Sequence, residues 1–172
     1  MKQKLIEGID YEVIDNFLPE EEFSILYDKI SSPDFPWYYQ ANTIDLSDDP
    51  TKEKFFYFTH NIVNESKVNS PYFEYLQEII KILEIKHIMR IIVNLTPSLP
   101  KVLQEIEHED YIFPHKGALL YLNTNNGPTV LEDGTKIDSI RNRLLKFDTS
   151  RPHSASRCSD QKVRLNIIFN YL

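Results

Sequence analysis

The sequence predicts a mainly β fold with flanking helices: a double-stranded β-helix, or jelly roll, backed by two or three N-terminal helices. In residues 1–84, apolar side chains recur at helical spacing in two stretches. Residues 85–172 instead contain about eight short strand-like runs separated by turn residues, and no helical pattern. Helices followed by many short strands with tight turns favour two packed sheets covered by helices. We expect one domain of 172 residues, in which 1–84 supports a jelly-roll core formed by 85–172.

Two helices are expected in the N-terminal half. Pro19 precedes three glutamates, and a first-turn proline followed by acidic residues marks a helix start. The apolar residues that follow keep helical spacing, which predicts a helix over 19–31. Ser70 and Pro71 form a second cap with a first-turn proline, and a broad apolar stripe continues to about residue 84. Both helices are expected to pack on a sheet.

Two aromatic clusters, at 35–39 and 55–58, flank the polar segment 40–54. Aromatic side chains dominate core burial, so one interpretation is two strands joined by a loop, with the rings in the core. In the other interpretation, 40–54 is a mobile cover over a functional site, and Trp37 or Tyr38 belongs to the wall of that site. Both interpretations stay open at this point.

The strands of the second half follow one another closely. β-Branched and apolar residues fill 85–95, as in a strand deep inside a fold. Asp133 and Gly134 form the two-residue turn of a hairpin. Strands are also expected, in chain order, at 9–15 before the first helix, and then at 101–108, 118–124 (closed by turn residues 125–127), 129–132, 135–138, 143–148 and 163–171.

Composition excludes several classes of partner. The formal net charge is −7, which argues against a nucleic acid bound through its phosphates and against an anionic membrane surface. Cys158 is the single cysteine, so an internal disulfide is excluded and a reducing compartment is indicated. No apolar stretch approaches about 18 residues, and the first residues lack the apolar segment of a signal peptide. A soluble, cytoplasmic protein is expected.

The first candidate site residues are His108 and Asp110, which lie two apart in a segment that reads as extended. In an extended chain, such residues point to the same side and can bind one metal ion. Alone, this short motif has a high false-positive risk. His153, beyond a later apolar strand, completes a set of two imidazoles and one carboxylate. This is the ligand set of the facial triad in non-haem Fe(II) oxygenases.

The last predicted strand, 163–171, has two different faces. Its odd positions are all apolar, whereas its even positions carry Arg164, Asn166, Ile168 and Asn170. A cation on an inward face requires an anion, and a guanidinium binds a carboxylate through two parallel hydrogen bonds. An anionic ligand is therefore expected near this strand.

The order of these motifs resembles that of the iron and 2-oxoglutarate dependent dioxygenases, and most closely their prolyl hydroxylase branch. The resemblance covers about residues 106–172 and rests on a His-x-Asp pair, a Tyr-Leu-Asn strand, an Arg-Leu-Leu-x-Phe strand, a Pro-His pair and Arg-x-x-x-x-x-x-Tyr. It implies that His108, Asp110 and His153 ligate Fe(II). It also implies 2-oxoglutarate and O2 as co-substrates.

The same resemblance assigns the co-substrate anchor. Arg164 would bind the distal carboxylate of 2-oxoglutarate, and Tyr121 would donate a hydrogen bond to the same group. The loop from His153 to Arg164 is slightly longer than in prolyl hydroxylases, and Lys162, on the same face of the strand, is an alternative anchor.

The function implied by the resemblance is hydroxylation of a small molecule or of a prolyl or other peptide side chain, with 2-oxoglutarate converted to succinate and CO2. Two alternatives stay open. One is a cupin-like metal enzyme that uses no 2-oxoglutarate, and the other is a non-catalytic jelly-roll binding module.

The other histidines are expected to have different roles. His60 and His87 are interpreted as hydrogen-bonded packing residues. His115 lies in the loop after His108 and is an alternative to His153 as third ligand. Asn94 is interpreted as a strand-end amide bonded to backbone, with a pocket position as the alternative.

Overall fold

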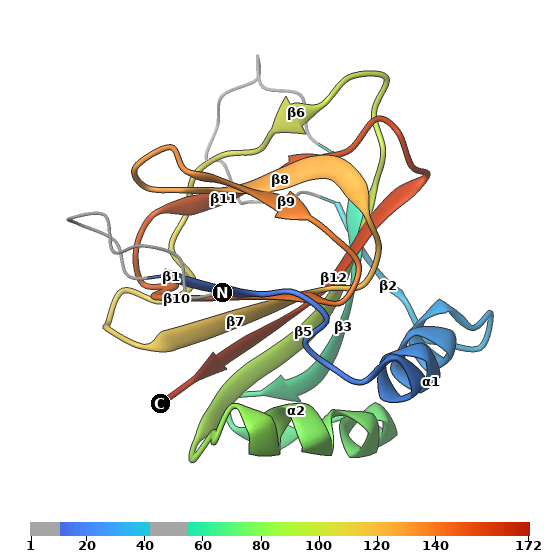
Figure 1. The fold of residues 1–172 in the computed structure, drawn as a ribbon, viewed down its shortest axis with the longest axis vertical. Coiled ribbons are helices and arrows are strands. Elements are labelled where there is room, and N and C mark those ends of the chain that lie inside the picture. The colour runs from blue at the N-terminus through green and yellow to red at the C-terminus, as the bar shows by residue number, and fades with distance from the viewer. Residues whose placement is uncertain (1–10, 42–54) are drawn as a thin grey trace.

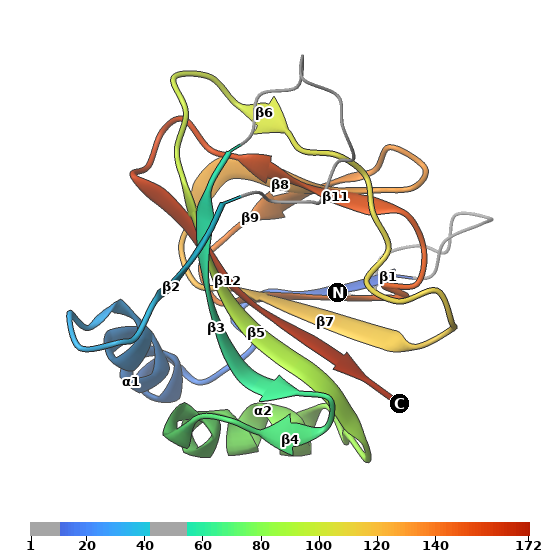
Figure 2. The same cartoon turned by 180° about the vertical axis from the view of Figure 1, so that it is seen from behind.

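A computed structural model of the chain describes residues 11–41 and 55–172 (Figure 1). Two sheets face each other, and the helices lie on the outer face of the larger sheet (Figures 1 and 2). The expectation for a jelly roll with flanking helices is confirmed, with two α-helices and one short 3-10 helix in the described part of the chain.

The larger sheet has eight strands, all paired antiparallel. They are, in chain order, β1 (Tyr11–Ile14), β2 (Tyr38–Gln40), β3 (Tyr57–Asn64), β4 (Lys67–Val68), β5 (Ile88–Pro97), β7 (Lys116–Tyr121), β10 (Arg143–Phe147) and β12 (Val163–Tyr171). Their order across the sheet is β1, β10, β7, β12, β5, β3 and β2, with β4 beside β3. The C-terminal strand β12 therefore lies at the centre of this sheet.

The smaller sheet has four strands, β6 (Leu103–Gln104), β8 (Asn125–Leu131), β9 (Lys136–Ser139) and β11 (His153–Arg157). Their order across the sheet is β6, β11, β8 and β9. The predicted hairpin is confirmed, because β8 and β9 pair across Gly134, whose φ of 81° requires the freedom of glycine.

Helix α1 (Glu20–Ser31) confirms the first predicted helix. The second prediction is only partly right, since the 3-10 helix η1 (Pro71–Leu76) precedes a short α2 (Gln77–Ile82). Residues three apart are aligned in a 3-10 helix, and this alignment places the rings of Tyr72 and Tyr75 6.2 Å apart. Apolar spacing alone did not distinguish this geometry from an α-helix.

The strands of the larger sheet bury one face under the helices and turn the other toward the smaller sheet. On β12, Leu165, Ile167 and Phe169 belong to the hydrophobic core, which also contains residues of α1. Arg164 and Ile168 face the space between the sheets. The predicted alternation of β12 is confirmed, and it separates a core layer from a cavity layer.

Two predicted strands have different bounds in the structure. Of the expected strand 101–108, only β6 and a single bridge from His108 to His153 form. The expected turn at 125–127 is instead the start of β8, and the chain reverses before it. The side chain of Asn123, just before β8, is tied to β12: it accepts from the backbone N–H of Leu165 at 2.8 Å and donates to the carbonyl of Val163 at 2.8 Å.

The two aromatic clusters have different surroundings. Phe35 is buried in the core, with the Trp37 ring 4.8 Å away, as the first interpretation expects. In the second cluster, Phe56 is exposed and Tyr57 faces the cavity between the sheets, so the expectation that all these rings are in the core is wrong. Neither Trp37 nor Tyr38 lines that cavity. The predicted cover lies mostly outside the described residues, which resume at residue 55.

Candidate metal centre

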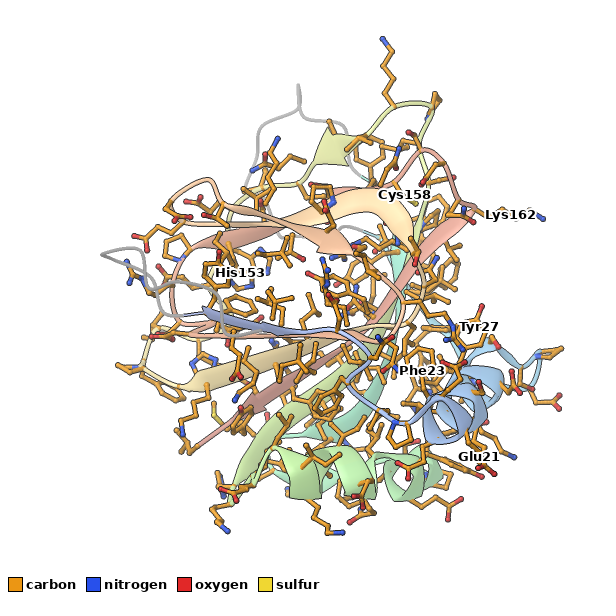
Figure 3. The ribbon with its side chains drawn as sticks, viewed as in Figure 1. Glu21, Phe23, Tyr27, His153, Cys158 and Lys162 are labelled. Carbon is orange, nitrogen blue, oxygen red and sulfur yellow. The ribbon has the colours of Figure 1, made fainter. Side chains whose placement is uncertain are left out.

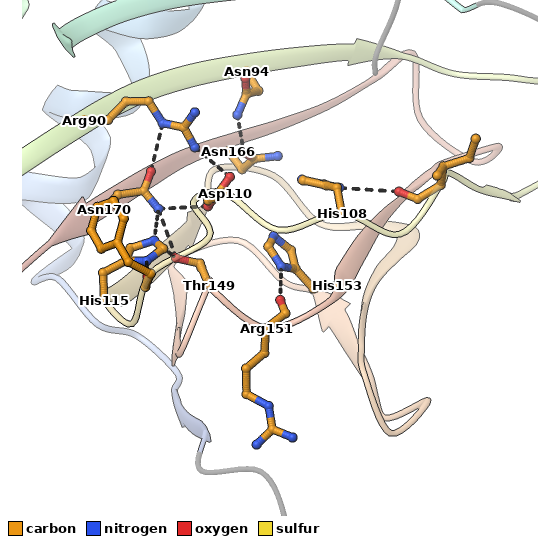
Figure 4. A network of polar contacts seen from close by, with 12 residues as sticks. Arg90, Asn94, His108, Asp110, His115, Thr149, Arg151, His153, Asn166 and Asn170 are labelled. Atoms are coloured by element: carbon orange, nitrogen blue, oxygen red, sulfur yellow. Dashed lines mark hydrogen bonds and ion pairs between the residues drawn. The ribbon is translucent and has the colours of Figure 1, made fainter. Parts of the chain in front are cut away.

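His108, Asp110 and His153 come together at one end of the space between the sheets (Figure 4). Each offers a ligand atom, and these atoms all lie within 4.8 Å of one another. Backbone hydrogen bonds fix this arrangement, since His108 and His153 exchange two N–H to carbonyl bonds of 2.9 Å. The backbone N–H of Asp110 donates to the carbonyl of Thr149 at 2.9 Å.

Both imidazoles have their Nδ1 atom next to a backbone carbonyl. Nδ1 of His153 lies 2.9 Å from the carbonyl oxygen of Arg151, and Nδ1 of His108 lies 3.4 Å from that of Ile106. A carbonyl oxygen only accepts, so Nδ1 carries the hydrogen and Nε2 presents its lone pair. Burial, with the neighbouring His108, lowers the pKa of His153 and favours the neutral, ligating form.

The Asp110 carboxylate is held from two sides. Nη2 of Arg90 donates to Oδ1 at 2.6 Å, and Nδ2 of Asn170 donates to Oδ2 at 2.8 Å. Burial raises the pKa of Asp110, but the charge of Arg90 and the other neighbours outweigh it, and the pKa lies below its usual value. The carboxylate is thus ionised at neutral pH, and each oxygen keeps a lone pair for a metal ion.

His115 is buried and belongs to the surroundings of the cluster rather than to its ligand atoms. Its Nδ1 donates to the carbonyl of Phe113 at 2.9 Å, and its Nε2 lies 2.7 Å from the hydroxyl of Thr149. Both nitrogens of His115 therefore have partners. This geometry favours His153 over His115 as third ligand.

The remaining histidines lie apart from the cluster. His60 is buried and contacts the carbonyl of Pro36 at 2.7 Å and the hydroxyl of Ser70 at 2.8 Å. His87 lies at the surface, 3.2 Å from the hydroxyl of Ser66. The expectation of a hydrogen-bonded packing residue is confirmed for His60, but it is wrong for His87, which has a hydrogen-bond partner and is exposed before the start of β5.

A cavity of about 280 Å³ extends from the three residues between the two sheets. Leu119 and Ile168 contribute apolar wall, and Asn94 and Asn166 contribute amides that are bonded to each other at 3.2 Å. The alternative expectation for Asn94, a pocket position, therefore describes this structure. The size and mixed lining are typical of a site for a small molecule.

Arg164 forms the wall of this cavity on β12 and is only 2% exposed. Its Nε atom donates to the carbonyl of Gly127 at 3.1 Å and to the Ser139 hydroxyl at 3.2 Å, and Nη2 donates to the Thr129 hydroxyl at 2.9 Å. Burial lowers the pKa of Arg164. Among the described residues, no carboxylate lies within ion-pair distance of this guanidinium.

Glu105 acts on Arg164 across the cavity without forming an ion pair with it. A buried cation without an ion-pair partner is costly, so the position of Arg164 indicates that the cavity receives an anion. Lys162, the alternative anchor, is exposed and projects away from the molecule, whereas His153 points into the interior (Figure 3). The structure therefore places Arg164, and not Lys162, in the cavity wall.

Tyr121 is fully buried, and its hydroxyl donates to Thr129 at 2.7 Å. Thr129 lines the cavity and accepts from both Tyr121 and Arg164, so its own hydroxyl hydrogen is available to a ligand. Sequence reasoning missed Thr129, because a threonine in a β-strand carries no distinctive signal. In this structure Tyr121 acts on the cavity through Thr129.

Sequence reasoning also missed Arg90 as a partner of Asp110. The available signal was its position on the same face of β5 as Asn94. It missed Glu105 too, which lines the cavity and forms a 2.8 Å ion pair with the buried Arg157. Burial raises the pKa of Glu105, and the charge of Arg157 opposes this effect.

The residues present fit an Fe(II) ion. Two imidazole nitrogens and one carboxylate that lie close together and face a cavity are the donor set of mononuclear non-haem iron sites. The chemical identity of these three donor groups is the basis for naming Fe(II). A facial set of this kind leaves the other side of the ion open to ligands in the cavity.

None of the helices in the described part of the chain is long and apolar enough to span a membrane. Compared by sequence, the chain matches no family model and no curated protein.

Comparison of the fold with solved structures gives clear matches. A prolyl hydroxylase from Trichoplax adhaerens, in complex with a peptide fragment of the hypoxia inducible factor oxygen degradation domain, matches with a TM-score of 0.67 at 19% identity, over 94% of this chain and 83% of that chain. A 2OG-Fe(II) oxygenase family protein from Burkholderia pseudomallei matches with a TM-score of 0.68 at 11% identity, over 94% and 84%.

A viral collagen prolyl hydroxylase from Paramecium Bursaria Chlorella virus-1, as a 2OG complex, matches with a TM-score of 0.60 at 13% identity, over 93% of this chain and 94% of that chain. These matches cover nearly the whole chain, and they compare folds rather than sequences. The chain has the fold of the iron and 2-oxoglutarate dependent oxygenases, in the form found in prolyl hydroxylases.

Proposed function

We propose that this protein is an Fe(II)- and 2-oxoglutarate-dependent dioxygenase that hydroxylates an organic substrate. The observation that carries the proposal is one cavity with two complementary parts. His108, Asp110 and His153 converge at one place in its wall, and the buried cation of Arg164 lies in another. A cavity that offers both a metal site and a guanidinium suits a ligand with a chelating group and a separate carboxylate.

Each residue has a defined part in this proposal. The Nε2 atoms of His108 and His153 and one oxygen of Asp110 would hold Fe(II). Arg164 would bind the distal carboxylate of 2-oxoglutarate through charge-assisted hydrogen bonds, and the Thr129 hydroxyl would donate to the same group. Tyr121 would fix the orientation of Thr129. When bound, the metal and its co-substrates supply the oxidation, in which 2-oxoglutarate becomes succinate and CO2 and one oxygen atom enters a C–H bond of the substrate.

The proposed substrate class is a prolyl or other peptide side chain. Its support is the likeness to prolyl hydroxylases, one of which is in complex with a peptide. This step from fold to substrate is an analogy. A small molecule is the alternative substrate.

The first experiment measures succinate formed by the purified 172-residue chain with Fe(II), 2-oxoglutarate and O2. Turnover without added substrate is expected to be slow and to depend on both Fe(II) and 2-oxoglutarate. His153→Ala is expected to abolish this turnover and to lower the bound iron, whereas His87→Ala, a surface histidine, is expected to change neither. Unchanged iron content in His153→Ala contradicts the assigned ligands.

The second experiment screens peptides by mass spectrometry for a gain of one oxygen atom. Metal binding without any 2-oxoglutarate consumption would instead indicate a cupin-like enzyme of another reaction class. Absence of both metal binding and turnover would indicate a non-catalytic binding module.

A further inference from the structure

Arg90 makes the shortest contact to the proposed metal-binding cluster. Its side chain reaches from strand β5, next to the central strand β12, and its Nη2 atom lies 2.6 Å from Oδ1 of Asp110. The side chains of the pair are 21% and 10% exposed, so water and salt screen the interaction only weakly. A full positive charge is therefore fixed beside an atom that is expected to ligate a divalent cation.

The position of the guanidinium is fixed on more than one side. Nε of Arg90 donates to Oδ1 of Asn170 at 2.9 Å, while Nδ2 of Asn170 donates to Asp110 at 2.8 Å (Figure 4). Arg90, Asn170 and Asp110 thus close a ring of hydrogen bonds. The ring of Tyr111 also lies 5.1 Å from the guanidinium carbon. A metal ion cannot easily displace a guanidinium held in this way.

Asn170 is tied to the rest of the fold in turn. It is fully buried, and its Nδ2 atom also lies 3.0 Å from the Thr149 hydroxyl, which contacts His115. Asn170 therefore gives the Asp110 carboxylate a second hydrogen bond, which does not depend on the charge of Arg90. The charge of Arg90 is an additional feature that orientation does not require.

We propose, on the basis of the proposed function, that Arg90 is a positioning residue that competes with the metal ion for Asp110 and lowers the affinity of the site for divalent cations. Two physical effects point the same way. Arg90 occupies one lone pair of the ligating carboxylate, and its positive charge repels a cation bound a few ångströms away in a poorly screened environment. The three ligands consequently hold an ion less tightly than they would beside a neutral residue.

The test compares three variants of the metal-free, 172-residue chain. Arg90→Gln keeps a hydrogen-bond donor but removes the charge, Arg90→Met removes both, and Arg90→Lys keeps the charge. Calorimetric titration with Mn(II) or Co(II) is expected to show binding about tenfold tighter in Arg90→Gln than in the wild type, because the repulsion is lost. Arg90→Lys is expected to stay within about threefold of the wild type.

A matched control removes an arginine–aspartate pair away from the cavity. Arg143 and Asp15 form a 2.6 Å ion pair, so Arg143→Gln is expected to leave metal affinity unchanged. The visible spectrum of bound Co(II) reports whether the ligand geometry is preserved. It is expected to be the same in Arg90→Gln and in the wild type, because Asn170 still holds Asp110.

Three outcomes are distinguishable. Tighter binding in Arg90→Gln with an unchanged Co(II) spectrum supports the proposal. Equal or weaker binding in Arg90→Gln overturns it, and a changed spectrum then assigns Arg90 to orientation alone. If the wild type binds no divalent metal, or binds it equally after Asp110→Ala, the proposed function fails together with this inference. Should Arg90→Met not fold, the comparison of Arg90→Gln with Arg90→Lys carries the same information.

Discussion

At the scale of single residues, each proposed ligand depends on a neighbour outside the sequence motif. The carbonyl of Arg151 fixes the Nδ1 hydrogen of His153, and Asn170 fixes the carboxylate of Asp110. Such neighbours set the tautomer and orientation of a metal ligand. A motif search finds the ligands, but the geometry that makes them usable comes from these hydrogen bonds.

The lowered pKa of His153 predicts how metal binding responds to pH. Its imidazole stays neutral below the ordinary histidine value of 6.5, because burial opposes protonation. We expect protonation of His153 to weaken Mn(II) binding only once the pH passes its lowered pKa, and then by about tenfold per pH unit.

The same shift affects stability. Between the lowered pKa and pH 6.5 the unfolded chain binds a proton that the folded chain does not, so the free energy of unfolding decreases as the pH falls through this window. Titration of Mn(II) binding and urea unfolding at several pH values measure both effects. A loss of Mn(II) affinity that begins above pH 7 would contradict the expectation.

The cavity contacts predict an order of effects on 2-oxoglutarate binding. Arg164→Met removes the buried charge and is expected to cost about 2–5 kcal/mol, a weakening of roughly 30-fold or more. Thr129→Val removes a direct donor and is expected to weaken binding by roughly tenfold. Tyr121→Phe, which acts through Thr129, is expected to have the smallest effect. Calorimetry with Mn(II)-loaded protein measures all three, and an effect of Tyr121→Phe larger than that of Thr129→Val would contradict this order.

At the scale of elements, strands β8 and β11 approach each other closely at Gly127. A Cβ atom there would meet the carbonyl oxygen of Ser156 at 2.5 Å and the backbone nitrogen of Cys158 at 3.0 Å. These are backbone atoms, so the strands themselves would have to separate. The carbonyl of Gly127 also accepts from Arg164, which couples strand spacing to the cavity.

We therefore expect Gly127→Ala to lower the free energy of unfolding by about 1–3 kcal/mol and to weaken 2-oxoglutarate binding. Gly134 offers a matched control, because its Cβ would have no atom within 4 Å while its φ is 81°. Gly134→Ala is expected to lower stability by about 1 kcal/mol through backbone strain alone, with unchanged ligand affinity. Urea unfolding and calorimetry separate the two cases. Equal ligand affinity in both variants would show that Gly127 does not couple to the cavity.

The element scale also shows where sequence patterns were insufficient. The helical stripe after Pro71 did not reveal that its first part is a 3-10 helix, because both geometries bring residues three apart close together. The strand expected at 101–108 is reduced to β6 and a bridge at His108, because strand length depends on available partners.

At the scale of the whole molecule, the larger sheet separates two different environments. Ile167 is fully buried in the core beneath the helices, whereas its neighbour Ile168 lines the cavity. Ile167→Ala is expected to lower the free energy of unfolding by about 2–5 kcal/mol, because it leaves a void in a close-packed layer. Ile168→Ala only enlarges an existing cavity, and its cost is expected to be about 1–2 kcal/mol.

Urea unfolding of the two alanine variants tests this two-sided architecture. For 2-oxoglutarate affinity the order is reversed. Ile168→Ala is expected to lower this affinity, and Ile167→Ala is expected to leave it unchanged. Equal effects of the two variants on unfolding would contradict the assignment of the two faces.

The sequence by itself determined the periodicity of this protein: the first helix, the alternating faces of β12 and the order of residues that carry metal-binding chemistry. These features are local, because the period of a helix or strand and the ligand properties of histidine and aspartate do not depend on distant residues. Only the tertiary structure decided that His115 contacts Thr149, that Arg164 and not Lys162 lines the cavity, and that Arg90 contacts Asp110. These contacts join residues 20 or more positions apart, and sheet pairing and burial, rather than spacing along the chain, bring them together.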